Sequence, residues 1–182
     1  MKLYVGEPHD AHVEAAVGAV GRPGEGVVAV SAVLYAEVSA ALAAKARAGH
    51  ITRGYHDEAA SFLRRDVAQL YLVRPLTGGI VERAGGLPSP VPVPGDPEEG
   101  RYPLKGYDAI QLATALDYRD DLLERARQSV DPREVEPGRP VELHPEDLLV
   151  LSFDNALHDA CVAEGIAYAR PDRAGGRTFD AP

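Results

Sequence analysis

Hydrophobic positions along the chain follow two patterns: short apolar runs, and longer stretches with a three- to four-residue period. The short runs are typical of buried strands, and the longer stretches are typical of helices with one apolar face. Strands that alternate with helices predict an α/β sandwich with a mostly parallel sheet. The predicted strands are Val27–Val30, Tyr71–Val73, Leu148–Ser152 and Ile166–Ala169, and the predicted helices are Ser31–Ala48, a helix from Thr52 or Asp57 to Leu70, Gly79–Ala84, Tyr107–Leu123 and Asn155–Glu164.

Local signals mark the ends of these helices. Ser31 can cap the first helix, and Gly49 stands where a glycine commonly follows a helix. Either Thr52 or Asp57 can open the next helix, and Gly165 predicts the end of the last one.

The faces of two helices are also predicted by their spacing. The helix that ends near Leu70 is expected to turn Phe62, Val67 and Leu70 inward. The Tyr107–Leu123 segment has the spacing of a strongly amphipathic helix.

The sequence predicts a single domain spanning residues 1–182, with three segments that are not assigned to the elements above. The first twenty residues are ambiguous, because Lys2–Val5 could be a short strand while the wider segment has helical spacing. Gly85–Pro103 and Gln128–Pro145 are rich in proline and polar residues, which predicts two insertions outside the core.

Composition and charge narrow the class of protein. The chain of 182 residues is long enough for a real core, and it contains neither a signal-peptide pattern nor an apolar run of membrane-spanning length. Cys161 is the single cysteine, so a reducing cytoplasm is the expected location. The net charge of −9 argues against a broad basic surface for nucleic acid. The charge remains compatible with a carboxylate site that needs cations, or with a basic partner protein.

Glu37 lies inside the predicted Ser31–Ala48 helix, with Val33, Leu34 and Ala41 one turn away on either side. It is therefore expected on an apolar face, where a carboxylate needs a partner or a cation. The alternative is a glutamate at the edge of that face whose carboxylate reaches solvent.

Asp108 and Asp154 each stand where a helix begins. Asp108 can be an N-cap, with Gln111 completing a capping pair and Tyr107 packing on Leu112. Asp154 can also be an N-cap, but it follows a predicted strand, where α/β proteins often place ligands. Together with Glu37, the two aspartates make a set of hard oxygen donors suited to Mg²⁺.

The ordered segments resemble the PIN-domain family of the VapC toxin type. The segment 31–42 (SAVLYAEVSAAL) resembles the part of that family that presents a glutamate. The segment 107–116 (YDAIQLATAL) resembles the family's most recognisable helix, and 149–157 (LVLSFDNAL) resembles its strand followed by an aspartate. The resemblance covers most of the chain apart from the two insertions.

The resemblance implies a PIN-like three-layer α/β/α sandwich in which a quartet of acids binds Mg²⁺ or Mn²⁺. It implies an endoribonuclease that hydrolyses RNA phosphodiester bonds, held in check by a cognate antitoxin protein and able to form a homodimer. By motif, Glu37, Asp108 and Asp154 are the matching catalytic and metal-binding acids. Ser152 is a further hydroxyl candidate, whereas His158 and Asp159 are expected on the surface.

The chain departs from the family at its start. PIN domains open with a hydrophobic strand that ends in an aspartate, whereas this chain begins MKLYVGEP, which resembles the helix that follows. The first strand and its aspartate are therefore expected to be missing from this chain, and the natural start is expected upstream.

Two other classes of function compete with a ribonuclease. A catalytically impaired PIN-like binding protein would keep the fold and its partner without cutting RNA. A receiver-like phosphoacceptor would need an acidic pair near the N-terminus and a lysine after a later strand, and neither is present. The phosphate-loop, dinucleotide-binding, zinc-protease and serine-hydrolase motifs are also absent from the sequence.

Overall fold

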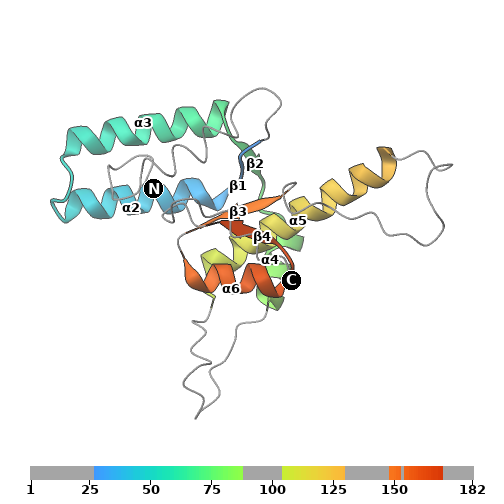
Figure 1. Cartoon of the computed structure of the whole chain (residues 1–182). Helices are drawn as coiled ribbons and strands as arrows, with labels where there is room; N and C mark the ends of the chain where they lie inside the picture. The colour runs from blue at the N-terminus through green and yellow to red at the C-terminus, as the bar shows by residue number, and fades with distance from the viewer. Residues whose placement is uncertain (1–26, 88–103, 130–147, 153, 170–182) are drawn as a thin grey trace, which may run out of the picture. The chain divides into compact units, whose positions relative to one another are not determined.

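The computed structural model describes residues 27–87, 104–129, 148–152 and 154–169 (Figure 1). It divides the chain into two compact units, Met1–Leu76 and Thr77–Pro182. Each unit combines helices with a short parallel strand pair, so the fold is mixed α/β and mostly helical. The possible strand at Lys2–Val5 and most of both predicted insertions lie outside the described residues.

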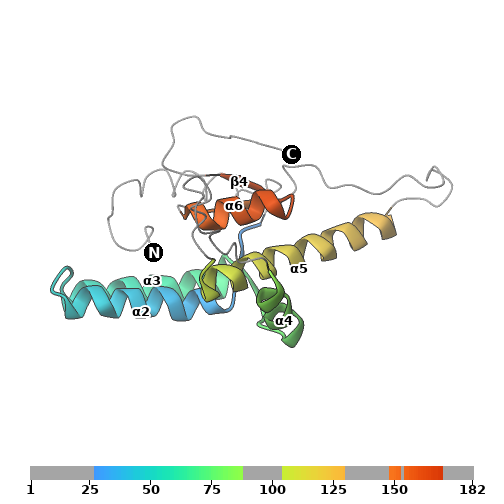
Figure 2. The same cartoon turned by 90° about the horizontal axis from the view of Figure 1, so that it is seen from below.

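The first unit pairs two long helices, α2 (Val33–Arg47) and α3 (Arg53–Gln69), which lie side by side in both views (Figures 1 and 2). Its strands, β1 (Ala29–Ser31) and β2 (Leu72–Arg74), form a parallel ladder. This part of the strand and helix order follows the prediction, with the strands displaced by one or two residues.

The turn between α2 and α3 is set by local residues. Gly49 adopts a positive φ of 74°, and the His50 N–H then donates to the Lys45 carbonyl at 2.9 Å. That bond closes a Schellman turn, which satisfies a carbonyl at the end of the helix. Thr52 is the residue that opens α3, because its Oγ1 accepts the Tyr55 N–H at 3.2 Å. The choice left open between Thr52 and Asp57 is thereby settled.

Ser31 does not cap α2 as predicted. It is the last residue of β1, and Ala32 occupies the cap position without a side-chain hydrogen bond. The Ser31 Oγ still accepts the Val33 N–H, at 3.4 Å. The strand therefore extends one residue beyond its apolar run, to Ser31, and the Ser31 hydroxyl lies beside the Val33 amide.

The predicted inner face of α3 was wrong at two of its three positions. Phe62 is 42% exposed and Leu70 is 63% exposed, while Val67 does pack on the core. The stripe that faces α2 is instead Ala59, Leu63 and Val67, which are spaced four residues apart. Phe62 lies on the adjacent stripe, where the Arg65 guanidinium carbon stands over its ring, 5.0 Å from the ring centroid.

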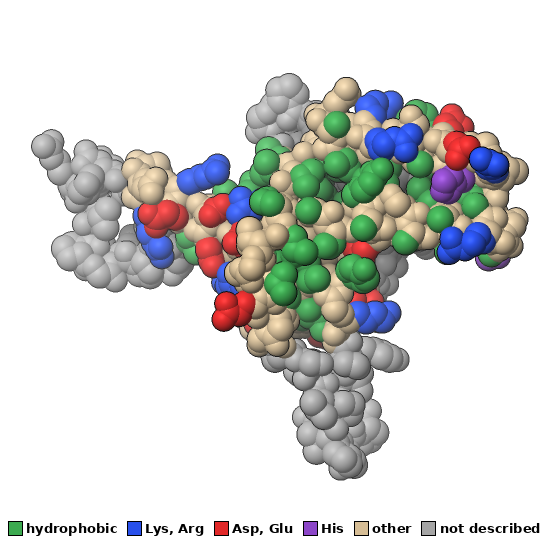
Figure 3. All heavy atoms as spheres, turned by 180° about the vertical axis from the view of Figure 1, so that it is seen from behind, with side chains coloured by type: hydrophobic (Ala, Val, Ile, Leu, Met, Phe, Trp, Pro, Cys, Tyr) green, Lys and Arg blue, Asp and Glu red, His purple; other side chains and the backbone are tan. Residues whose placement is uncertain are grey.

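Large apolar side chains also reach solvent elsewhere among the described residues. Tyr35 and Tyr55 are more than a third exposed on α2 and α3. Figure 3 shows how hydrophobic side chains gather among charged ones on one face of the molecule.

The described residues of the second unit form three helices and a second parallel ladder. Its elements are α4 (Gly78–Gly86), α5 (Gly106–Ser129), β3 (Leu149–Leu151), α6 (Asn155–Ala163) and β4 (Ala167–Ala169). Helix α6 connects the two parallel strands β3 and β4, which is the crossover connection that parallel strands require. The predicted helix at Gly79–Ala84 is confirmed as α4, and α5 runs six residues further than predicted.

A buried hydrophobic seam joins α5 to α6. It contains Leu112 and Leu116 from α5, Leu157 and Cys161 from α6, and Ile166 just before β4. Four of these side chains are at most 2% exposed, and Ile166 is 4% exposed. Burying a leucine side chain contributes roughly 1.5–3 kcal/mol, so this seam is the main source of stability that the described residues show in the second unit.

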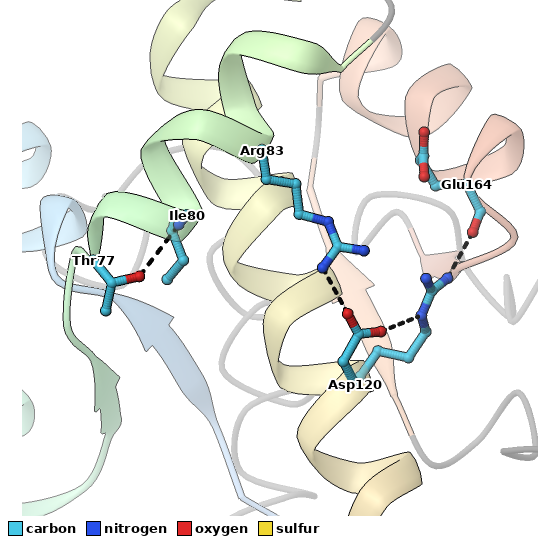
Figure 4. A network of polar contacts seen from close by, with 6 residues as sticks. Thr77, Ile80, Arg83, Asp120 and Glu164 are labelled. Atoms are coloured by element: carbon cyan, nitrogen blue, oxygen red, sulfur yellow. Dashed lines mark hydrogen bonds and ion pairs between the residues drawn. The ribbon is translucent and has the colours of Figure 1, made fainter.

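Polar contacts hold the same three helices at the far end of the seam (Figure 4). Arg83 on α4 donates to Asp120 on α5 at 2.7 Å. Arg119 lies 3.6 Å from the same carboxylate and donates to the Glu164 carbonyl at 2.8 Å. That carbonyl belongs to the residue that ends α6, so an arginine of α5 satisfies the C-terminal end of its neighbour.

Among the described residues, no helix combines the length and apolar character needed to cross a bilayer.

Gly49 and Gly54 allow a matched test of the α2–α3 turn. A Cβ at either position meets nothing within 4 Å, but only Gly49 has a positive φ. Gly49→Ala is expected to lower the free energy of unfolding by about 1 kcal/mol, because a side chain there strains the backbone. Gly54→Ala is expected to raise it by about 0.5 kcal/mol, because alanine favours the helix. Urea unfolding measures both, and equal effects would contradict the turn geometry.

Cys161 offers a probe of the seam. Burial raises the pKa of its thiol from 9.0 to about 12. Because the thiolate is the reactive form, labelling by a thiol reagent at pH 8 is expected to be roughly 1000-fold slower than for an exposed cysteine. The rate should recover in denaturant, and prompt labelling of the native protein would rule out this packing.

Candidate functional site

Asp108 and Asp154 come together in the second unit, where α5 and α6 begin. The seam packs α5 on α6, and Arg119 lies against the other end of α6 at Glu164. The two helices therefore run in the same general direction, and their N-terminal ends carry the two aspartates. Each helix N-terminus is the positive end of a helix dipole, which favours a negative charge nearby.

Asp108 is the third residue of α5 and not its N-cap, which corrects the prediction. The Lys105 carbonyl accepts the Ala109 N–H at 2.8 Å, so Lys105 stands just before the helix. The Asp108 carboxylate accepts the Lys105 backbone N–H in return. This is the contact that an acid at the third helical position makes in a capping box. The predicted pairing of Asp108 with Gln111 as cap and partner is therefore wrong.

The pKa of Asp108 is raised above its ordinary value of 3.8. Burial is the largest cause, since it disfavours the charged form, and the negative charge of Asp154 is the second. The charge of Lys105 and its backbone N–H act in the opposite direction without cancelling these effects. The site thus places two carboxylates near one another in partly desolvated surroundings, and a cation would relieve both effects.

Asp154 is the N-cap of α6, as one of its two interpretations predicted. One of its carboxylate oxygens, Oδ1, accepts the Leu157 N–H at 3.1 Å. Its own N–H donates to the Ser152 Oγ at 3.0 Å. The cap uses a single oxygen of the carboxylate, so capping and metal binding are compatible roles for this side chain.

Ser152 and Asp159 are both described. Ser152 uses its hydroxyl oxygen to hold the Asp154 backbone, so a further role as a ligand stays a prediction. Asp159 is exposed on α6, which confirms its expected surface position.

His158 was predicted on the surface, and the structure buries it to 5% exposure. Leu157, His158 and Cys161 form one stripe of α6 that faces the rest of the unit. The spacing of these three residues is helical, so the stripe was visible in the sequence. The prediction failed because it did not take this spacing into account.

Glu37 belongs to the first unit, where it is half-buried on α2 beside the buried Val38. The buried stripe of this helix is Val38 and Leu42, with Leu34 partly buried, so Glu37 flanks the stripe and does not interrupt it. Its place beside the aspartates stays a prediction.

Within the described ranges, no group of three or more histidine, cysteine, aspartate or glutamate side chains is placed to hold a metal ion. The acids that the structure brings together are a pair. Mg²⁺ is commonly bound through one or two carboxylates together with water and substrate phosphate oxygens. A pair of hard oxygen donors with unrelieved repulsion fits that mode of binding.

Comparison of the chain with models of protein families, with curated proteins and with solved structures gives no match.

The raised pKa of Asp108 predicts a pH-dependent cost in metal-free buffer. A carboxyl whose pKa is higher in the folded protein binds its proton more tightly there, so stability falls as pH rises from about 4 to the folded pKa. Asp108→Asn is expected to remove that fall and to raise stability at pH 7 by less than about 1 kcal/mol, because solvent screens a partly exposed group. Thermal unfolding in EDTA from pH 3 to 7 measures the effect. A variant less stable than wild type at pH 7 would show that the carboxylate is instead a net stabiliser.

Proposed function

We propose that this chain is a metal-dependent endoribonuclease of the PIN-domain, VapC-like kind, which hydrolyses RNA phosphodiester bonds. The observation that carries the proposal is the placement of Asp108 and Asp154 together at the first turns of α5 and α6, with the pKa of Asp108 raised by burial and by its neighbour. Each carboxylate makes a capping contact, and the two also repel one another. That cost is typical of functional sites.

Asp108 and Asp154 would hold a Mg²⁺ or Mn²⁺ ion, and the resemblance to PIN domains assigns Glu37 as a third acid. A bound divalent ion supplies charge that stabilises the phosphoryl oxygens and lowers the pKa of a bound water. The carboxylates supply the negative charge that retains the ion, and each stands at the positive end of a helix dipole. We further propose that the chain folds as a three-layer PIN sandwich and that it acts in the cytoplasm.

The proposed partners follow from the same resemblance and from the net charge. The RNA substrate would reach the acids through the metal, because a protein with a net charge of −9 has little general attraction for phosphate. A cognate antitoxin with basic groups would be attracted to the acidic site. A homodimer is compatible with this assignment.

A second candidate is a PIN-like protein that binds its partner without cutting RNA. It is favoured by the structural use of both acids, since Asp154 caps α6 and Asp108 binds the Lys105 amide. A chain that keeps these acids for capping alone would need neither a metal nor a scissile phosphate.

RNA cleavage in Mn²⁺ separates the two candidates. Asp108→Asn and Asp154→Asn are expected to lower the cleavage rate on the order of 100-fold or more, because each removes charge that holds the ion. Asparagine is as good an N-cap as aspartate, so Asp154→Asn removes the charge and keeps the cap. Isothermal titration calorimetry should show that both variants also bind Mn²⁺ more weakly than the wild-type protein.

Asp159→Asn is the matched control, because Asp159 is an exposed aspartate on the same helix as the cap. It should cleave RNA within about 3-fold of wild type, since charge in high dielectric has little effect on a distant site. If the wild-type protein binds RNA but neither binds Mn²⁺ nor cuts, the binding protein replaces the nuclease. If Asp108→Asn cuts as well as wild type, this pair is not the active site.

A further inference from the structure

Two polar contacts converge on Ser152, which lies between β3 and α6. The Ser152 Oγ accepts the Asp154 N–H at 3.0 Å, and the Ser152 carbonyl lies 2.8 Å from the His158 Nε2. The Asp154 carboxylate accepts the Leu157 N–H at 3.1 Å. Ser152 is thus held at both its side chain and its carbonyl. Its hydroxyl contacts the backbone of Asp154, which is the proposed metal ligand.

The contact with His158 defines the tautomer of its ring. A carbonyl oxygen only accepts hydrogen bonds, so the Nε2 must carry the hydrogen and donate it. His158 lies one helical turn after Asp154, so its donor reaches back across the first turn of α6 to the chain that enters the helix.

The imidazole itself is held in place from the other side. It stacks on the Tyr168 ring of β4, with the ring centroids 4.5 Å apart and an angle of 27° between the planes. The side chain is 5% exposed, so water does not compete strongly for its donor. The stacked ring and the buried donor hold the Ser152 carbonyl in place. Because the Ser152 hydroxyl also accepts the Asp154 N–H, this restraint extends to the backbone of Asp154.

We propose that His158 is a positioning residue for the Asp154 carboxylate, acting through the Ser152 carbonyl. The proposal rests on the function proposed above, because it assigns His158 to the same metal site. The physical basis is general: groups that orient a metal ligand without touching the metal commonly contribute 10- to 100-fold to metal affinity. A buried histidine that only fills space would contribute to stability without affecting the metal.

Two substitutions separate the donor from the ring. His158→Phe keeps an aromatic ring against Tyr168 and removes the donor to Ser152. His158→Gln carries an amide nitrogen at about the reach of Nε2 and removes the ring. If the donor positions Asp154, the phenylalanine variant should bind Mn²⁺ about 10-fold more weakly. The glutamine variant should recover to within about 3-fold of wild type.

Cys161→Ala controls for general loss of packing. Cys161 is fully buried on the same stripe of α6, one turn beyond Leu157, and it makes no part of the Ser152 turn. This variant should unfold at a lower temperature than wild type and still bind Mn²⁺ with wild-type affinity. Loss of affinity in Cys161→Ala equal to that in His158→Phe would overturn the proposal, since it would assign the effect to stability.

Amide hydrogen exchange tests the same idea without metal. In EDTA, His158→Phe should lower the protection of the Asp154 and Leu157 amides by about 10-fold, and His158→Gln should restore it. Unchanged protection of those amides overturns the positioning role. If the wild-type protein binds no Mn²⁺, the proposed nuclease fails, and the exchange of the two amides alone then decides whether His158 positions the turn.

Discussion

The packing of α5 on α6 along a buried seam is the interaction on which the second unit depends. Leu112 and Leu116 meet Leu157 and Cys161 there, and each leucine contributes roughly 1.5–3 kcal/mol on burial. The seam aligns the helices so that two acidic N-terminal ends lie together. Repulsion between partly exposed carboxylates amounts to about 1 kcal/mol or less. The seam therefore outweighs the repulsion, and each acid also makes a capping contact at the start of its helix.

The two ends of this helix pair differ in their electrostatics. At one end Arg119 and Arg83 satisfy Asp120 and the carbonyl that ends α6, so positive and negative groups are matched. At the other end the charge of Asp154 raises the pKa of Asp108, and the charge of Lys105 acts in the opposite direction. The matched end anchors the helices, and the other end is the site proposed above for a cation.

The sequence predicted features that depend on a few neighbouring residues. Thr52, Gly49 and Gly165 mark helix ends in the sequence and in the structure, because capping bonds and positive φ angles are local. The alternation of short strands with helices also predicted the parallel ladders. The relation of Glu37 to the aspartates could not be obtained in this way, because it depends on contacts between segments far apart in the chain.

Faces of helices were predicted less well than their ends. Phe62 was expected inside from the spacing of apolar residues, but the stripe of α3 that faces α2 consists of Ala59, Leu63 and Val67. His158 was expected outside, but it has a carbonyl to bind and a ring to stack on. Both errors arose because the local sequence does not show what each side chain packs against. In each case the burial of the side chain depends on the residues that pack against it, and those residues belong to another segment of the chain.

A capping role for Asp154 is compatible with the metal-binding role proposed for it. A carboxylate has two oxygens, and the cap of α6 needs only the Asp154 oxygen that accepts the Leu157 N–H. The cap restricts the rotation of the side chain, so a ligand that also caps a helix is held in place before any ion arrives. At such a position asparagine and aspartate differ little as caps and greatly as ligands. What distinguishes a metal ligand from a structural cap here is therefore its charge, and the charge of Asp154 is the property that Asp108 senses.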